Sequence, residues 1–251
     1  MKLLAFETAT EACSVAVWID GEVSERFELA PRRHAELSLP WAEQLLAEAG
    51  IARSQLDAIA VGRGPGAFTG VRLAIAIGQG IALALDRPIV PVSTLAALAM
   101  RAAVPAGAVA SDTRDGISPV QARLRILAAI DARMNEVYVG RFELREGEAI
   151  ALGDETIAAP DAVELLETGR DWRGVGTGFD ALGGLLRQRL SSCLRSVDAE
   201  ALPHAADIAR LAASAYARGG AIAPELVEPA YLRNNVALTI AEQQALRDSR
   251  S

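Results

Sequence analysis

The fold is decided by the stretch Val61-Gly-Arg-Gly-Pro-Gly-Ala-Phe-Thr-Gly-Val-Arg72. An apolar run over 58–61 leads into it and predicts a strand, and the apolar run after it predicts a helix over 71–85. A strand, a glycine loop and a helix N-terminus in this order indicate an α/β fold, and they can place backbone N–H groups around an anion. Because Pro65 lacks an N–H and the lysine of a P-loop is absent, a turn whose glycines let backbones pack closely is favoured over a phosphate cradle.

The residues around this stretch predict two lobes, a linker and a tail. The expected parts are an N-terminal lobe at 1–104 with the order β-β-β-α-β-α-β-α, a loop or linker at 105–122, a C-terminal lobe at 123–203, a helix at 204–220 that can pack back on the N-terminal lobe, and an extended tail at 221–251. Further helices are expected at 37–49, with Pro40 in the first turn, at 161–167 and at 179–190. Together these elements predict an α/β protein with a mostly α-helical last third.

The chain repeats a pattern at an offset of 124 residues. Leu3-Leu-Ala-Phe-Glu7 matches Leu127-Ala-Ala-Ile-Asp131, and the alternating run at 13–18 matches the one at 137–142. Each unit is an apolar strand that ends in an acid, then a turn, then an alternating strand. The match predicts an internal duplication, although any two β-hairpins share much of this pattern.

Composition excludes several classes of protein. The chain has 251 residues, a net charge of −7 and no block of basic residues, so strong nucleic-acid binding by this chain alone is not expected. Its two cysteines and two histidines are far apart in the sequence, which gives neither a disulfide framework nor a zinc motif. The helix expected at 71–85 is interrupted by glycine and glutamine, which argues against a membrane span. We expect a reduced, cytoplasmic protein.

Two turns are candidates for phosphate binding. Glu7 ends the first strand, and Thr8 and Thr10 follow it, an arrangement that suits a Mg²⁺-phosphate complex. The simpler interpretation is a hairpin whose threonines satisfy the turn backbone. Asp131 begins the matching turn of the second unit, but no glycine lies between it and Val139 to let a phosphate approach. These positions are therefore interpreted as vestigial, and no cofactor is expected on the isolated chain.

The helix after the glycine loop is a candidate interface. Ala74, Gly78 and Ala82 form a stripe of small residues that permits close approach of another helix, and the helix is apolar nearly all round. Trp41 and Leu45 of the preceding helix are expected beside this stripe. The alternative is that the stripe packs against the sheet of its own lobe. A helix with two apolar sides still suggests a second partner, such as another chain.

Four stretches closely resemble the TsaB family, also called YeaZ. They are 3–17, Gly62-Arg-Gly-Pro-Gly-Ala-Phe-Thr-Gly-Val-Arg72, Ile130-Asp-Ala-Arg-Met-Asn-Glu-Val-Tyr138 and Pro229-Ala-Tyr-Leu-Arg233, and they span almost the whole chain in order. The departures are Glu7, where an aspartate is usual, and a longer polar connection at 111–125. The resemblance implies an actin/Hsp70/sugar-kinase-like (ASKHA) fold with two related α/β lobes.

The resemblance also implies a function. TsaB-like proteins are partners of TsaD, a paralogue that carries the metal and the catalysis, and with TsaE they install threonylcarbamoyl on adenosine 37 of tRNA. TsaD-like subunits bind metal through two histidines, and Thr94 and Leu98 stand at the corresponding positions here. We therefore expect a non-catalytic scaffold or activating subunit, with ATP or ADP and the metal on the partner, tRNA contacted only through the complex, and a homodimer as a further possible state. The alternative is an ATP-binding phosphotransferase or a metal-dependent peptidase of the same fold.

Overall fold

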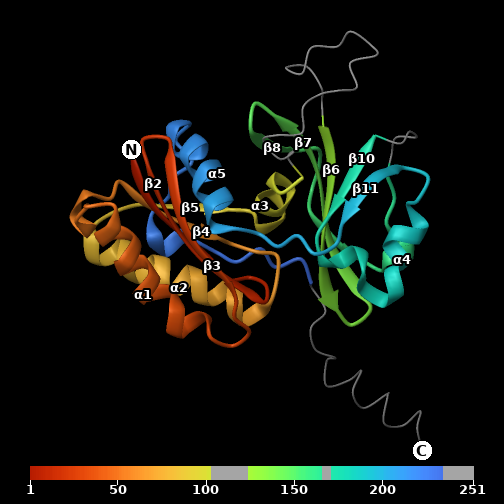
Figure 1. Cartoon of the computed structure of the whole chain (residues 1–251), viewed down its shortest axis with the longest axis horizontal. Coiled ribbons are helices and arrows are strands. Elements are labelled where there is room, and N and C mark those ends of the chain that lie inside the picture. The colour runs from red at the N-terminus through yellow and green to blue at the C-terminus, as the bar shows by residue number, and fades with distance from the viewer. Residues whose placement is uncertain (103–123, 166–170, 234–251) are drawn as a thin grey trace, which may run out of the picture.

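Two α/β lobes lie side by side in the part of the chain that the structure, a computed structural model, describes (Figure 1). The described residues are 1–102, 124–165 and 171–233. Four of the expected parts lie wholly or partly outside these residues. They are the linker at 105–122, the longer connection at 111–125 up to residue 123, the end of the helix expected at 161–167, and the tail from 234 onward.

The N-terminal lobe is built on a mixed sheet with the strand order β3-β2-β1-β4-β5. Its strands are β1 (Lys2–Glu7), β2 (Ala12–Ile19), β3 (Glu22–Leu29), β4 (Ala58–Gly62) and β5 (Ile89–Val92). The first three strands form antiparallel pairs, and β4 and β5 continue from β1 in parallel. Since parallel neighbours need crossover connections, helices must cover the faces of this sheet.

Helices cover both faces of the N-terminal sheet. On one face α1 (His34–Glu48) and α2 (Phe68–Leu85) pack on Leu4 and Phe6, and on the other α3 (Thr94–Met100) and α5 (Ala205–Ala217) pack near Leu3 and Ala5. The alternation along β1 follows the two-residue period of a strand. The expected return of the last helix to the N-terminal lobe is therefore observed (Figure 1).

Two helices begin earlier than the sequence pattern predicts. Both α1 and α2 start three residues before the expected positions, at His34 and Phe68. As a result Pro40 lies inside α1 rather than in its first turn, so the expectation for this proline is wrong. With 18 residues, α2 also has the length and hydropathy of a membrane span, but one of its faces is buried in the core of the N-terminal lobe.

The C-terminal lobe repeats the topology of the first. Its strands are β6 (Leu124–Arg133), β7 (Glu136–Arg145), β8 (Glu148–Ala151), β9 (Thr156–Ala158), β10 (Trp172–Val175) and β11 (Leu194–Asp198), in the order β8-β7-β6-β10-β11 with β9 beside β7. The order and the strand directions match β3-β2-β1-β4-β5. This identity confirms the duplication that the 124-residue offset predicts.

The helices of the C-terminal lobe are shorter than expected. Only a 3₁₀ turn, Pro160–Ala162, forms at the start of the helix expected at 161–167, and α4 covers Ala181–Arg189 of the one expected at 179–190. Left-handed backbone angles at Leu182, Gly183 and Gly184 interrupt its first turn. The last third of the chain is therefore less helical than expected, since Leu194–Asp198 forms the strand β11.

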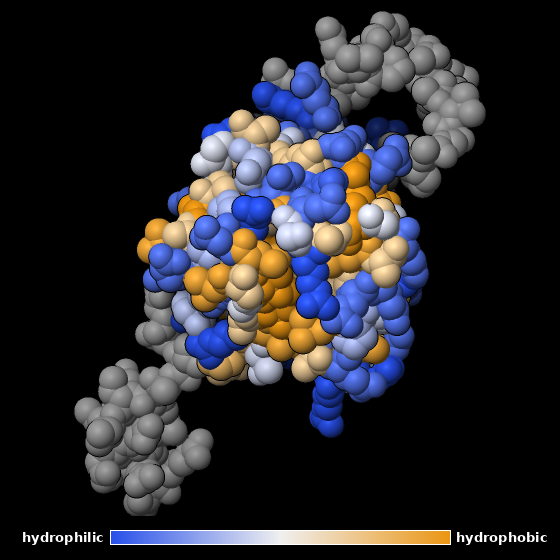
Figure 2. Space-filling view, turned by 90° about the vertical axis from the view of Figure 1, so that its left-hand side faces the viewer, coloured by the Kyte–Doolittle hydropathy of each residue, from blue (hydrophilic) through white to orange (hydrophobic). Residues whose placement is uncertain are grey.

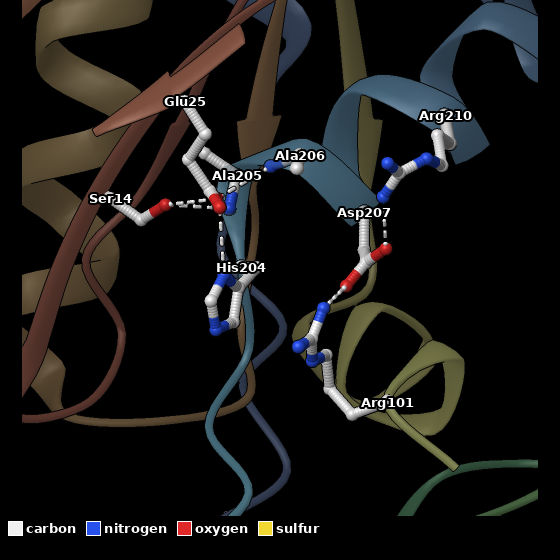
Figure 3. A network of polar contacts seen from close by, with 8 residues as sticks. All are labelled: Ser14, Glu25, Arg101, His204, Ala205, Ala206, Asp207 and Arg210. Carbon is white, nitrogen blue, oxygen red and sulfur yellow. Dashed lines mark hydrogen bonds and ion pairs between the residues drawn. The ribbon is translucent and has the colours of Figure 1, made fainter. Parts of the chain in front are cut away.

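Polar contacts fix the N-terminal turn of α5 to the first lobe (Figure 3). The hydroxyl of Ser14 accepts the N–H of Ala205 at 2.8 Å, and Oε1 of Glu25 accepts the N–H of Ala206 at 2.9 Å. His204 Nδ1 lies 2.8 Å from the other carboxylate oxygen of Glu25. Burial alone would raise the pKa of Glu25, but these hydrogen bonds lower it below its usual value. The carboxylate thus caps α5 from a neighbouring strand, where negative charge is favourable.

Candidate functional site

Glu7 and Thr8 of the first hairpin turn are buried inside the N-terminal lobe. The Oε1 atom of Glu7 accepts the N–H of Ala9 at 2.7 Å, and Oε2 accepts the hydroxyl of Thr94 at 2.9 Å. Burial raises the pKa of Glu7 to about 7, against the effect of these hydrogen bonds. Thr8 is also buried and donates to the carbonyl of Gly70 at 2.7 Å. Both residues therefore serve the internal packing of the turn.

The glycine loop packs against this turn with its backbone. A Cβ atom on Gly62 would lie 2.0 Å from Oε2 of Glu7, and one on Gly70 would lie 2.0 Å from the carbonyl oxygen of Thr8. The N–H of Ala67 donates to the carbonyl of Ala9 at 2.7 Å. Because Gly62, Gly70 and the Ala67 N–H face the first hairpin turn, the loop positions α2 against β1, which agrees with the close-packing interpretation of its glycines.

The second hairpin turn has an uncommon backbone. Arg133, Met134 and Asn135 are three consecutive non-glycine residues with φ of 60°, 53° and 63°. Left-handed angles cost on the order of 1 kcal/mol for each such residue. Asp131 stabilises the turn, since its Oδ1 accepts the N–H of Arg133 at 2.8 Å and its Oδ2 lies 2.8 Å from the guanidinium of the same residue. Arg133 and Asp131 thus form an ion pair at the surface of the turn.

A cleft of about 840 Å³ lies between the lobes, and both turns line it. Of the four phosphate-hairpin candidates, the cleft brings together only Thr10 and Asp131, whereas Glu7 and Thr8 point into the first lobe. Residues 229–233 line a further side of the cleft. In the described ranges, no three histidine, cysteine, aspartate or glutamate side chains are grouped as metal ligands.

The small-residue stripe of α2 faces the core, and its assignment as an interface is wrong. Ala74 and Ala82 are fully buried in the cluster under α2, and a Cβ on Gly78 would meet Val61 at 2.4 Å. Leu45 is fully buried in the same cluster, and Trp41 packs against it. The residues are small because the helix must approach its own sheet closely, which is the alternative that the sequence left open.

The opposite face of α2 carries exposed apolar residues. Phe68 and Leu83 are 63% and 62% exposed, and the small residues Ala76 and Gly80 lie exposed between them. Ile77 is half-buried at the edge of this face. Figure 2 looks onto the N-terminal lobe and shows apolar residues gathered in a patch with polar residues around it. The four exposed apolar residues of this face, Phe68, Ala76, Gly80 and Leu83, are called the outer face of α2 below. The exposed Arg72 lies on the same face and stacks on the ring of Phe68.

Comparison with known proteins places the chain in a family. The family model described as TsaD, tRNA N6-adenosine threonylcarbamoyltransferase, matches residues 27–241. The tRNA threonylcarbamoyladenosine biosynthesis protein TsaB of Escherichia coli K12 is 42% identical over 94% of this chain and 96% of its own length. The chain belongs to the TsaB family. The Haemophilus influenzae TsaB is 36% identical over 94% of the chain and 95% of that protein.

A solved structure of a TsaB-family relative agrees with the two-lobed fold. It comes from Pseudomonas aeruginosa and is described as an uncharacterized protein with similarity to peptidase YEAZ. The TM-score is 0.79 with 44% sequence identity, over 92% of this chain and 99% of that one. The expected ASKHA-like fold is therefore confirmed.

In this TsaB-family chain, Thr94 and Leu98, which the resemblance sets against the metal-binding histidines expected in TsaD-like subunits, have structural roles. The hydroxyl of Thr94 accepts the N–H of Gly64 at 3.2 Å and donates to Glu7. Leu98 is fully buried in the cluster that joins α3 to the second sheet, where it approaches Gly176. A threonine fully engaged within the fold and a buried leucine supply no open ligand for a metal ion.

Proposed function

We propose that this chain is a non-catalytic subunit in the biosynthesis of threonylcarbamoyladenosine at position 37 of tRNA. It would act as a scaffold or activator that binds a TsaD-like paralogue, together with a TsaE-like ATPase, in the cytoplasm. The observation that carries the proposal is the outer face of α2, because an exposed apolar helix face of a soluble lobe is typical of a protein–protein interface. Family membership supports the pathway, since its relatives are named for that biosynthesis.

Catalysis and cofactors are assigned to the partner in this proposal. The carboxylate of Glu7 is buried and bonded on both oxygens, and Leu98 fills the position of a metal-binding histidine with a hydrocarbon side chain. ATP or ADP and the metal would thus bind the paralogue. The net charge of −7 supports a tRNA contact made through the complex rather than by this chain alone.

Charge placed on the outer face of α2 should prevent binding of the TsaD-like partner. In the complex, Leu83→Glu or Ala76→Arg would bury a charge in the interface and incur the cost of its desolvation. In the free protein, each substitution changes only an exposed side chain. We expect a loss of at least about thirtyfold in affinity, equivalent to about 2 kcal/mol, with an unchanged melting temperature. The measurement is calorimetric titration of the purified TsaD-like subunit, with and without the TsaE-like ATPase.

A matched control is Leu185→Glu, which introduces the same charge at a leucine of α4 that is 42% exposed. It should bind the partner normally. Equal binding by all three variants would place the interface elsewhere. The same variants in sedimentation experiments tell whether a homodimer uses this face, because a shared face loses both associations together.

The alternative, a phosphotransferase or metal-dependent peptidase, predicts that the isolated chain binds Mg-ATP or turns over a substrate. Under the scaffold proposal, calorimetry of the isolated chain with Mg-ATP should give no heat of binding. Micromolar binding with turnover, abolished by Glu7→Gln and by Asp131→Asn, would establish the enzyme instead. The two variants probe the ends of the two hairpin strands, where a nucleotide of this fold would contact the protein.

A further inference from the structure

The segment 221–233 crosses from the N-terminal lobe to the second hairpin turn and lies along the cleft. It follows α5 and begins with an antiparallel bridge in which Ile222 and Ile89 exchange N–H to carbonyl hydrogen bonds of 2.8 and 2.9 Å. The side chain of Gln79 donates to the carbonyl of Pro224 at 2.8 Å, and Val227 is buried in the cluster under α2. The first half of the segment thus belongs to the N-terminal lobe.

The second half of the segment reaches the glycine loop and the start of α2. The N–H of Ala230 donates to the carbonyl of Arg63 at 2.8 Å. The guanidinium of Arg72 donates through Nε to the hydroxyl of Tyr231 at 2.9 Å, and it lies 3.3 Å from the ring centroid of Phe68. Residues 229–233 line the cleft over this course.

Arg233 then contacts the other lobe. Its Nη2 atom donates to Oε2 of Glu136 at 2.6 Å and to the carbonyl of Ala132 at 3.2 Å, and it lies 3.4 Å from the carbonyl of Arg133. Its Nη1 atom lies 2.6 Å from the sulfur of Met134. The side chains of Arg233 and Glu136 are 16% and 36% exposed, so the pair is partly shielded from solvent, chiefly on the arginine side.

The groups that Arg233 holds belong to the turn with three left-handed residues. A turn of this kind persists only where the surroundings over-determine it. Among the described residues, the first hairpin turn offers little support, since its only ion pair with the second is Glu11 to Arg133 at 3.9 Å between exposed side chains. The Arg233 guanidinium therefore supplies a polar tie between the lobes on the cleft side, in addition to the contact of the Ser93 hydroxyl with Glu155.

We propose that residues 221–233 act as a strap that fixes the cleft opening without a ligand, and that Arg233 is its positioning residue. The buried cluster around α3 joins the lobes on one side, and the cleft side can open and close about it unless that side is also held. The strap keeps the lobes at one spacing in the free protein, so the outer face of α2 and the second lobe present a constant surface. This inference does not depend on which partner binds that surface.

The test is hydrogen exchange of the full chain in Arg233→Gln. Amides of 131–136 should exchange about tenfold faster or more, because the variant loses a charge-assisted bond, while amides of α2 stay protected. The matched control is Arg53→Gln, which removes an ion pair of 2.6 Å with Glu43 inside the N-terminal lobe and should leave 131–136 unchanged. Glu136→Gln removes the carboxylate that pairs with Arg233 and should have the same effect on 131–136. It serves as the test if the arginine variant does not fold.

Lobe spacing is measured in parallel with spin labels. The labels are placed at exposed positions of the two lobes, Glu36→Cys and Asp161→Cys, in a Cys193→Ser background that leaves only the buried Cys13. Arg233→Gln should broaden the distance distribution, and Arg53→Gln should not. Unchanged exchange at 131–136 together with an unchanged distribution, in folded Arg233→Gln and Glu136→Gln, would overturn the proposal.

Discussion

Raising the pH from 5 to 8 should destabilise the N-terminal lobe through one carboxyl group, that of Glu7. In the folded protein burial raises its pKa from 4.5 to about 7. Between these values the unfolded chain has lost the proton while the folded chain still holds it, so the free energy of unfolding falls as the pH rises and levels off above 7. The shift corresponds to about 3 kcal/mol. The variant Glu7→Gln, neutral at every pH, should lack this loss.

Urea denaturation at pH 5, 6.5 and 8 measures the effect as the difference between wild type and Glu7→Gln. The variant should gain relative stability toward pH 8. Glu36→Gln is the control, because that side chain is 68% exposed and should follow the wild-type pH profile. Glu25 has a lowered pKa, so its contribution is lost only at a pH below the window of Glu7. A constant difference between wild type and Glu7→Gln would mean that Glu7 ionises normally in the fold.

Alanine should have opposite effects at two glycines of α2. At Gly70 the new Cβ would lie 2.0 Å from the carbonyl oxygen of Thr8, a backbone atom that cannot move without shifting the first turn. We expect a loss of about 3 kcal/mol or more, at the upper end of overpacking effects. At Gly80 the Cβ would meet nothing within 4 Å, and the helix should gain about 0.5–1 kcal/mol.

The measurement is the free energy of unfolding of both variants, followed by tryptophan fluorescence. Trp18 and Trp41 report on the first lobe and Trp172 reports on the second, so the loss at Gly70 should be seen first by the N-terminal probes in single-tryptophan backgrounds. Equal tolerance of alanine at both sites would contradict the packing of α2 against the first turn.

Sequence patterns predicted β1 and β4 of the first lobe well because both are buried apolar runs. The same rule missed β11, which reads Leu194-Arg-Ser-Val-Asp198 and lies at the edge of its sheet with most of its side chains in solvent. The duplication was visible because both units end an apolar strand in an acid. The close packing of the glycine loop also followed from the sequence, since a loop with this many glycines lets backbones approach closely.

The orientation of α2 and the role of the strap depend on contacts that no local pattern contains. A helix apolar on nearly all sides has no periodicity to tell its inner face from its outer one. The buried stripe could be found only by seeing Gly78 against Val61. Arg233 meets Glu136 across 97 residues of sequence, and only the folded chain brings that pair together.

The place of Leu98 makes a histidine at this position costly to the fold. Its side chain belongs to a cluster shared by both lobes, where it touches Gly176 and lies among Ile126, Ala128 and Val175. A histidine restored at this position would bring a polar ring into hydrocarbon surroundings and would lose the packing of the leucine before any metal could bind. Because this cluster is shared by α3 and the second sheet, a substitution at Leu98 would disturb the packing of both lobes at once.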